Sequence, residues 1–187
     1  MITIEDGKVK ELQFSRDYQI HDEYDEEDLF EDDEEDDEDT LQDRFITFTI
    51  QDENYGFELF HVTEIISVQK ITHVPEMPDF VKGVINLRGR VVPVIDVRIR
   101  FGLSPIAYND KTCIIVVCVN ETDIGLVVDT VNEVIVIPEE NISQSPEVNR
   151  GKTSRFIKGM GYHSKKVTIL LDIYKLLYDK LKNDSHG

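Results

Sequence analysis

Three prolines and three glycines lie within residues 73–102, whose sequence is HVPEMPDFVKGVINLRGRVVPVIDVRIRFG. Proline fixes φ and lacks an N–H, and glycine can adopt positive φ, so this stretch must turn repeatedly. Two apolar, strand-like runs, Val84–Leu87 and Val91–Asp96, lie between the turns. The stretch contains no cysteine or serine, and its one histidine, His73, lies at its edge. We interpret it as a segment that holds a surface in shape rather than one that performs catalysis.

The turn between these two runs places an arginine at its tip. Gly89 is the natural turn residue, and Arg88 before it suits the second position of a type II turn. This geometry predicts that the Arg88 guanidinium points out of the hairpin. The sequence leaves two interpretations open: a solvated turn cation, or a recognition arginine, since arginine is enriched at interface hot spots. Pro93 in the second run predicts an edge or a bulge there.

The net charge of −18 is concentrated near the N-terminus. Residues 1–43 contain 20 acidic and 3 basic side chains, and residues 44–187 contain 18 acidic and 17 basic ones, so the two parts carry −17 and −1. All but three of residues 22–39 are acidic. Such a segment cannot bury enough apolar surface to collapse, so we predict an acidic, disordered extension over residues 1–43. Its charge disfavours binding of the chain to nucleic acid or to an anionic membrane.

Several roles of the acidic extension can be compared from its sequence. It is not an EF-hand loop, which needs a glycine at its midpoint and two flanking helices. It could fold back over the Arg88 region or recruit a basic partner, and residues 2–14 could form a short strand or helix on meeting a partner. The N-terminus lacks the pattern of a secretory signal, and no apolar run reaches the ~18 residues of a membrane span. We therefore expect a cytoplasmic protein.

Residues 44–182 have the pattern of a mainly β domain, followed by a short tail over 183–187. Alternating apolar residues predict strands at 45–51 and 55–59, and apolar runs predict strands at 84–87, 91–96, 112–119, 156–163 and 167–171. The strand at 112–119 is apolar on both faces and is predicted to be deeply buried, and residues 124–136 form one bent strand or two. The spacing of Leu59, Val62, Ile65 and Ile66 predicts a short helix, and Ile66–Val68 could continue as a strand. A loop is expected over 138–148, and Asp172 is expected to cap a C-terminal helix. This strand spacing favours two small antiparallel barrels, with junctions near residues 104–111 and at the C-terminal segment.

Candidate chemical sites are few. The five histidines are scattered, with no second histidine or cysteine at a metal spacing. Cys113 and Cys118 would face opposite sides of one strand, which predicts free thiols. Gly151-Lys152-Thr153 lacks the earlier glycine of a phosphate loop. Asp96 and Asp129 could form a carboxylate pair, but a salt bridge or a helix cap is the simpler interpretation, since Asp96 is followed by two arginines.

The stretch from Val74 to Gly102 resembles the chemotaxis coupling protein family, CheW. The shared pattern is Gly-Val-Ile-Asn-Leu-Arg-Gly followed by Val-Val-Pro-Val-Ile-Asp-Val-Arg, and further matches extend from Arg44 to Leu181. The resemblance implies two SH3-like five-stranded antiparallel β-barrels packed side by side, with short helices and a C-terminal helix. It also implies a non-enzymatic adaptor without cofactor or metal. Such an adaptor connects the cytoplasmic hairpin tip of transmembrane chemoreceptors to the regulatory domain of the histidine kinase CheA.

The same resemblance implies which residues bind. Receptor binding falls on Arg88, Asn86, Val62 and Val84, at a groove between the barrels. Binding of the kinase or another partner falls on Glu64, Gly83 and Gly89. The acidic extension departs from the family, which usually starts just before the first strand. A nucleic-acid-binding barrel is the main alternative, but the chain lacks tryptophan and a basic groove; an enzyme is a further one, without a catalytic constellation to support it.

Overall fold

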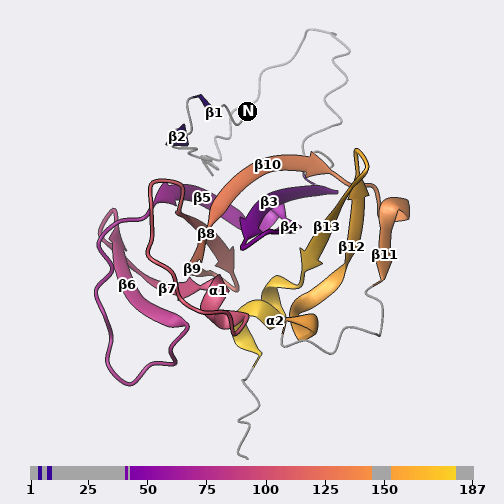
Figure 1. Cartoon of the computed structure of the whole chain (residues 1–187). Coiled ribbons are helices and arrows are strands. Elements are labelled where there is room, and N and C mark those ends of the chain that lie inside the picture. Colours follow the sequence, from indigo (N-terminus) through magenta and orange to yellow (C-terminus); the bar gives the residue numbers. More distant parts are fainter. Residues whose placement is uncertain (1–3, 6–7, 10–40, 42, 145–152, 180–187) are drawn as a thin grey trace, which may run out of the picture.

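The computed structural model describes residues 4–5, 8–9, 41, 43–144 and 153–179. Most of the acidic extension over residues 1–43, which was predicted to be disordered, and the short tail at 183–187 lie outside these residues. Within the N-terminal region, β1 (Ile4–Glu5) pairs antiparallel with β2 (Lys8–Val9). The rest of the described chain forms two curved β-sheets that lie side by side (Figure 1).

The larger sheet has six strands in the order β10-β3-β4-β13-β12-β11. Its strands are β3 (Arg44–Ile50), β4 (Glu53–Glu58), β10 (Thr130–Val136), β11 (Ile142–Gln144), β12 (Ile157–His163) and β13 (Lys166–Leu171). The smaller sheet has five strands in the order β5-β8-β9-β7-β6. Its strands are β5 (Val62–Ser67), β6 (Val81–Leu87), β7 (Arg90–Asp96), β8 (Cys113–Val119) and β9 (Thr122–Val128).

This arrangement confirms the predicted fold class of two small SH3-like barrels side by side. Three details of the sheets differ from the prediction. Ile142–Gln144, within the loop expected over 138–148, forms strand β11. The larger sheet has six strands, and each sheet contains one parallel pair, β13 with β4 and β7 with β9. Each parallel pair joins two strands that are not consecutive in the chain. Parallel strands need a long crossover connection, because a tight turn can join only antiparallel strands.

The predicted junction between the barrels near residues 104–111 is wrong. The chain leaves the larger sheet after β4, through the 3₁₀ turn Leu59–His61, and returns to it at Asp129, between β9 and β10. Residues 104–111 instead connect α1 (Val97–Arg100) to β8, within the smaller barrel. The proline and polar residues there signal a loop, but a loop signal does not reveal which elements it joins.

The short helix predicted from Leu59 to Ile66 is also wrong. Only Leu59–His61 forms a 3₁₀ turn, and Val62–Ser67 is β5, which pairs antiparallel with β8. The spacing of three and four arises because a bulge lies between Val62 and Glu64 and shifts the alternation by one residue. Pairing with a fully buried strand therefore overrides a local helical pattern.

A shared core joins the two barrels. β8 is apolar on both faces, as predicted: Ile115 and Val117 face the largest buried cluster, whereas Ile114 and Val116 face a smaller cluster inside the smaller barrel. The largest cluster also includes Phe48 of β3 and residues of α2 (Ile173–Tyr178). The two barrels therefore share one continuous core.

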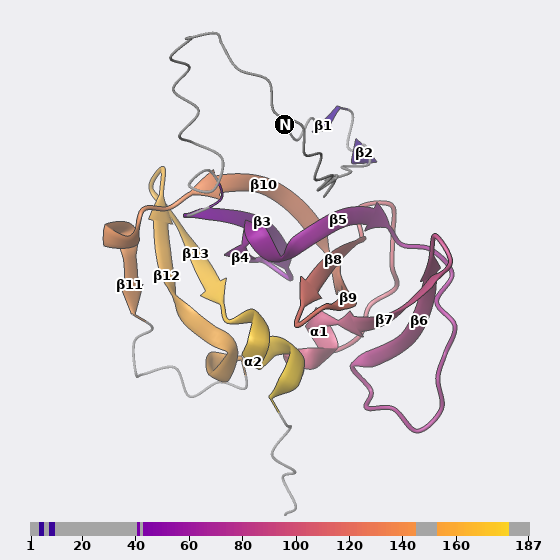
Figure 2. The same cartoon turned by 180° about the vertical axis from the view of Figure 1, so that it is seen from behind.

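The two helices lie where the sheets meet, as seen from the front and from behind (Figures 1 and 2). Asp96 accepts a hydrogen bond from the Ile99 N–H and caps α1, and Asp172 accepts one from the Lys175 N–H and caps α2. The helices are tied together by buried Arg100 of α1, whose Nε donates to the Leu176 carbonyl of α2 at 2.8 Å. The predicted caps are thus confirmed, as is the hairpin formed by β12 and β13.

Candidate interaction surface

The β6–β7 hairpin ends in a two-residue turn whose geometry differs from the prediction. Arg88 has a φ of 51° and Gly89 a φ of 83°. Positive φ at both central residues defines a type I′ turn, which matches the right-handed twist of the flanking strands, whereas a type II turn splays them. The Asn86 side-chain oxygen stabilises the turn by accepting a hydrogen bond from the Gly89 N–H at 2.8 Å.

The Arg88 guanidinium reaches across to a buried carboxylate on another strand. Its Nη1 donates to Glu64 Oε1 at 3.2 Å and its Nη2 to Glu64 Oε2 at 3.0 Å. The Glu64 side chain is 5% exposed, whereas that of Arg88 is 46% exposed. The guanidinium is therefore held by a two-pronged ion pair, while nearly half of the Arg88 side chain stays exposed.

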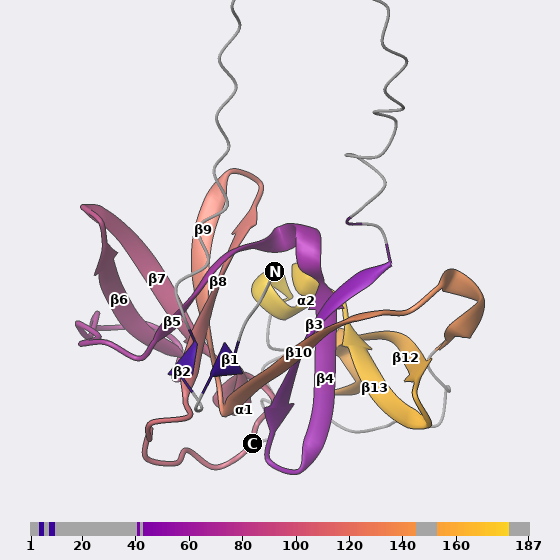
Figure 3. The ribbon, with the colours of Figure 1, turned by 90° about the horizontal axis from the view of Figure 1, so that it is seen from above.

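This ion pair joins the two edges of the smaller sheet. Glu64 lies on β5 and Arg88 follows β6, and these are the two outer strands of the five-stranded order. Figure 3 looks down on the two barrels and shows the β6–β7 hairpin at the side of the smaller one away from the larger sheet. The same two edges are brought together by Thr72, whose main chain exchanges hydrogen bonds with Val84 at 2.8 and 2.9 Å. The pair thus helps to close the barrel.

Gly83 allows this closure at the level of the backbone. Its φ is 136°, and a Cβ at this position would lie 2.0 Å from the Thr72 carbonyl oxygen. Any other residue would push the Thr72 segment away from β6. Gly89 differs, because no atom lies within 4 Å of a Cβ built there. Its role is limited to the positive φ of the turn.

The remaining predicted residues lie on the same barrel. Val62 begins β5, is half-buried and packs against the largest core cluster. Val84 is half-buried on β6 and pairs with Pro93 of β7. Pairing between β7 and β9 begins at Val94, so Pro93 precedes the doubly paired part of β7. The structure therefore brings Arg88 together with Glu64 and Asn86 together with Gly89, while Val62 takes no part in either contact.

Two further ion pairs were not predicted from the sequence. Arg90, at the start of β7, pairs with Asp123 of β9, and its side chain is 57% exposed. Arg98 of α1 pairs with Asp129, which also accepts a hydrogen bond from the Gln51 N–H at 2.7 Å. Asp96 caps α1 and Asp129 forms a salt bridge. This agrees with the simpler interpretation of these two residues, and not with a carboxylate pair. No sequence signal marks Asp123 or Glu64 as partners, because both come from strands far away in the chain.

The described residues show little that would support metal or redox chemistry. They contain no group of three or more histidine, cysteine and acidic side chains placed to hold a metal ion. Cys113 and Cys118 are both free thiols, as predicted. No helix within the described part of the chain is long and apolar enough to span a membrane.

Comparisons with known proteins agree with this architecture. The family model of the CheW-like domain matches residues 44–181. Chemotaxis protein CheW of Klebsiella aerogenes is 36% identical over 139 residues, which cover 74% of this chain and 84% of that protein. Chemotaxis protein CheW of Helicobacter pylori is 34% identical over 134 residues, covering 72% and 81%.

A solved structure supports the same assignment. The crystal structure of the scaffolding protein TtCheW from Thermoanaerobacter tengcongensis matches with a TM-score of 0.67 and 36% identity, covering 72% of this chain and 91% of that chain. The similarity therefore spans both barrels and nearly the whole of the relatives, and the chain belongs to the CheW-like domain family.

Proposed function

We propose that this chain is a non-enzymatic adaptor of bacterial chemotaxis, which couples transmembrane chemoreceptors to the histidine kinase CheA. The observation that carries the proposal is the match of the CheW-like domain over residues 44–181. The relatives named above are chemotaxis proteins, and the matching structure is described as a scaffolding protein. The adaptor would act in the cytoplasm and reach the membrane only through its receptor partners.

The receptor would bind at the surface that includes Arg88, Asn86, Val62 and Val84. The Arg88 side chain is 46% exposed and its guanidinium is held by Glu64, so it would present a cation in a fixed position. A donor group that is already ordered loses less entropy on binding than a mobile one. Val62 and Val84 are half-buried and would add apolar area to an amphipathic helix of the receptor tip.

For Glu64, Gly83 and Gly89, predicted to bind the kinase or another partner, we propose an indirect contribution. Glu64 would orient Arg88, Gly83 would permit the closure of the barrel, and Gly89 would set the turn. Their replacement would then impair partner binding through the shape of the hairpin. The kinase regulatory domain would meet a separate barrel face, so that one adaptor holds both partners at once.

Co-sedimentation tests this proposal. The full chain, a receptor cytoplasmic fragment and CheA are mixed, and the pellet is analysed. We expect CheA in the receptor pellet only when the adaptor is present. Arg88→Lys keeps a cation but loses the two-pronged geometry and should reduce receptor capture several-fold, whereas Arg90→Lys on the same hairpin should not. A full chain that leaves CheA in the supernatant would rule out the proposal.

A further inference from the structure

An open pocket of about 420 Å³ lies beside the C-terminal helix, away from the β6–β7 hairpin. It is lined by Arg155, Tyr174, Lys175 and Asp179. Arg155 comes from the 3₁₀ turn Ser154–Phe156 that precedes β12, and the other three come from α2 and the residue after it. Two of the four lining side chains are cations, and one is an anion.

The arginines at this pocket are poorly neutralised. Arg155 Nε is buried without a hydrogen-bond acceptor, and Asp179 Oδ2 lies 3.9 Å from it, beyond hydrogen-bond distance. Arg100, behind the pocket, donates to the main-chain carbonyls of Leu176 and Asp179. Burial lowers the pKa of Arg100, and the nearby charge of Arg155 lowers it further, against the opposing effect of Asp179. Two guanidinium groups thus share one carboxylate, and an additional anion would be stabilised here.

The guanidinium groups are also held in place by an aromatic ring. Arg100 and Arg155 both lie over the ring of Phe156, at 5.0 and 4.6 Å from its centroid. The cation–π contacts hold both groups in place, and Arg100 is also fixed by its main-chain hydrogen bonds, so binding of an anion requires little reordering. Lys175 pairs with Asp172 at 3.1 Å and remains 56% exposed.

Exposed aromatic side chains border the pocket. Tyr174 and Tyr178 are half-exposed and lie one helical turn apart on the same side of α2. His61 meets Tyr174 edge-on, with ring centroids 5.7 Å apart, and exposed Phe60 lies against His61 at 4.0 Å. The surface therefore combines cations with an aromatic strip, and it suits a ligand segment that is both acidic and aromatic.

We propose that residues 22–39 of this same chain dock on this surface, with their carboxylates at Arg155 and Lys175 and their apolar side chains on the aromatic strip. The segment reads DEYDEEDLFEDDEEDDED, and its three residues without charge are Tyr24, Leu29 and Phe30. The segment thus matches the pocket in charge and the aromatic strip in apolar character. The Arg88 region is a poorer receiver, because its guanidinium already faces the buried Glu64 carboxylate. This inference is independent of the proposed receptor and kinase partners.

The chain between the segment and the domain is long enough. Arg44, where β3 begins, follows Phe30 by fourteen positions, and an extended chain of that length spans roughly 45–50 Å. A compact domain of some 140 residues has a radius of gyration of about 14 Å and hence a diameter of roughly 36 Å. Phe30 can therefore reach the far side of the domain. The proposed contact joins carboxylates of the segment to exposed cations of the pocket, so salt should weaken it by screening.

Carbodiimide cross-linking of the full chain tests the proposal, since this reagent forms an amide only between a carboxylate and an amine in contact. Cross-linked peptides are mapped by mass spectrometry at low and high salt. We expect Lys175 to couple to residues 22–39 several-fold more than exposed Lys165 and Lys166 do, and we expect high salt to abolish the difference. Coupling of Lys175 to Asp172, its ion-pair partner, shows in the same experiment that the lysine is reactive.

Two variants and one mixing control complete the test. Arg155→Gln keeps Lys175 and all tail carboxylates, and it should lower the Lys175 coupling to the level of Lys165, with thermal unfolding checking the fold. Phe30→Ser should lower it in part. Equal coupling to all three lysines would overturn the proposal. Cross-linking a mixture of isotope-labelled and unlabelled chains distinguishes contacts within one chain from contacts between two chains. Cross-links found only between chains would also overturn the proposal.

Discussion

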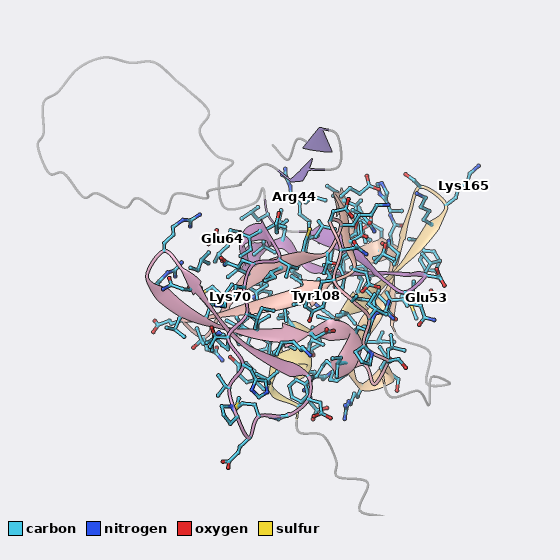
Figure 4. The ribbon with its side chains drawn as sticks, turned by 60° about the vertical axis from the view of Figure 1, so that its left-hand side comes forward. Arg44, Glu53, Glu64, Lys70, Tyr108 and Lys165 are labelled. Atoms are coloured by element: carbon cyan, nitrogen blue, oxygen red, sulfur yellow. The ribbon has the colours of Figure 1, made fainter. Side chains whose placement is uncertain are left out.

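Arg88 and Glu64 form a two-pronged ion pair that spans the two outer strands of the smaller barrel, with N–O distances of 3.2 and 3.0 Å. Figure 4 places Glu64 on the side of the smaller barrel, far from Lys165 at the tip of the β12–β13 hairpin of the larger one. The sequence left Arg88 open as a solvated turn cation or a recognition residue. The structure gives it a structural partner, Glu64, while nearly half of its side chain stays exposed.

Removal of Arg88 should destabilise the fold. Arg88→Ala leaves the Glu64 carboxylate buried without its partner, and we expect a loss of about 1–3 kcal/mol in the free energy of unfolding. Arg90→Ala is the matched control, because its ion pair with Asp123 is largely exposed and is worth at most ~1 kcal/mol. Urea denaturation measures both. In a double-mutant cycle, Arg88→Ala should cost less in the Glu64→Gln background, because no buried charge is then left unpaired. Equal stability of the two single arginine variants would contradict the structural role of the pair.

Two glycines of the hairpin should respond differently to alanine. At Gly83, a Cβ collides with the Thr72 carbonyl, so Gly83→Ala should break the hydrogen bonds between Thr72 and Val84 and open the barrel edge. At Gly89, the added methyl meets nothing, and Gly89→Ala should cost only the roughly 1–2 kcal/mol of positive φ. Hydrogen exchange at the Thr72 and Val84 amides distinguishes the two variants. Protection that is kept in Gly83→Ala would refute the argument.

The cap of α2 should contribute stability that depends on pH. Burial tends to raise the pKa of Asp172, but hydrogen bonds from Lys175 and its charge outweigh burial and lower the pKa. A folded-state pKa below the unfolded value of ~3.9 means that the stabilisation is present above that pH and is lost as the pH falls through the folded-state value. Asp172→Ala should therefore cost about 1 kcal/mol at neutral pH.

The pH dependence supplies the test of this cap. The stability difference between the natural chain and Asp172→Ala, from urea denaturation, should shrink as the pH falls below about 4. Asp110→Ala, at an exposed position in the loop before β8, is the control and should show little difference at any pH. A difference for Asp172→Ala that stays constant down to pH ~2 would show that the charge of Asp172 contributes nothing.

The two cysteines should differ in reactivity. Cys113 is buried, and burial raises the pKa of its thiol, so little reactive thiolate forms. Cys118 is only half-buried. Alkylation of the native protein should modify Cys118 slowly and Cys113 hardly at all, and both should react at once in denaturant. Faster alkylation of Cys113 than of Cys118 in the native protein would mean that the β8 strand end opens in solution.

Local patterns in the sequence were sufficient for much of the fold. Apolar runs predicted β8, β12 and β13, and Asp172 predicted the start of α2. These features depend on neighbouring residues, whose side-chain period and capping oxygens act over a few positions. The motif from Asn86 to Gly89 also led to the family, which the comparisons confirm.

The tertiary structure decided what depends on distant parts of the chain. β5 shows a helical spacing but becomes a strand because it pairs with buried β8, and the turn at Arg88 takes type I′ geometry because the strands twist. Glu64 and Arg88 are 24 residues apart, and only barrel closure brings them together. The sequence by itself thus determined most of the strands, the caps and the family. The order of strands in the sheets, set by burial of one shared core, determined where the chain passes from one barrel to the other. It also brought together Arg88 with Glu64 and the residues of the pocket at α2.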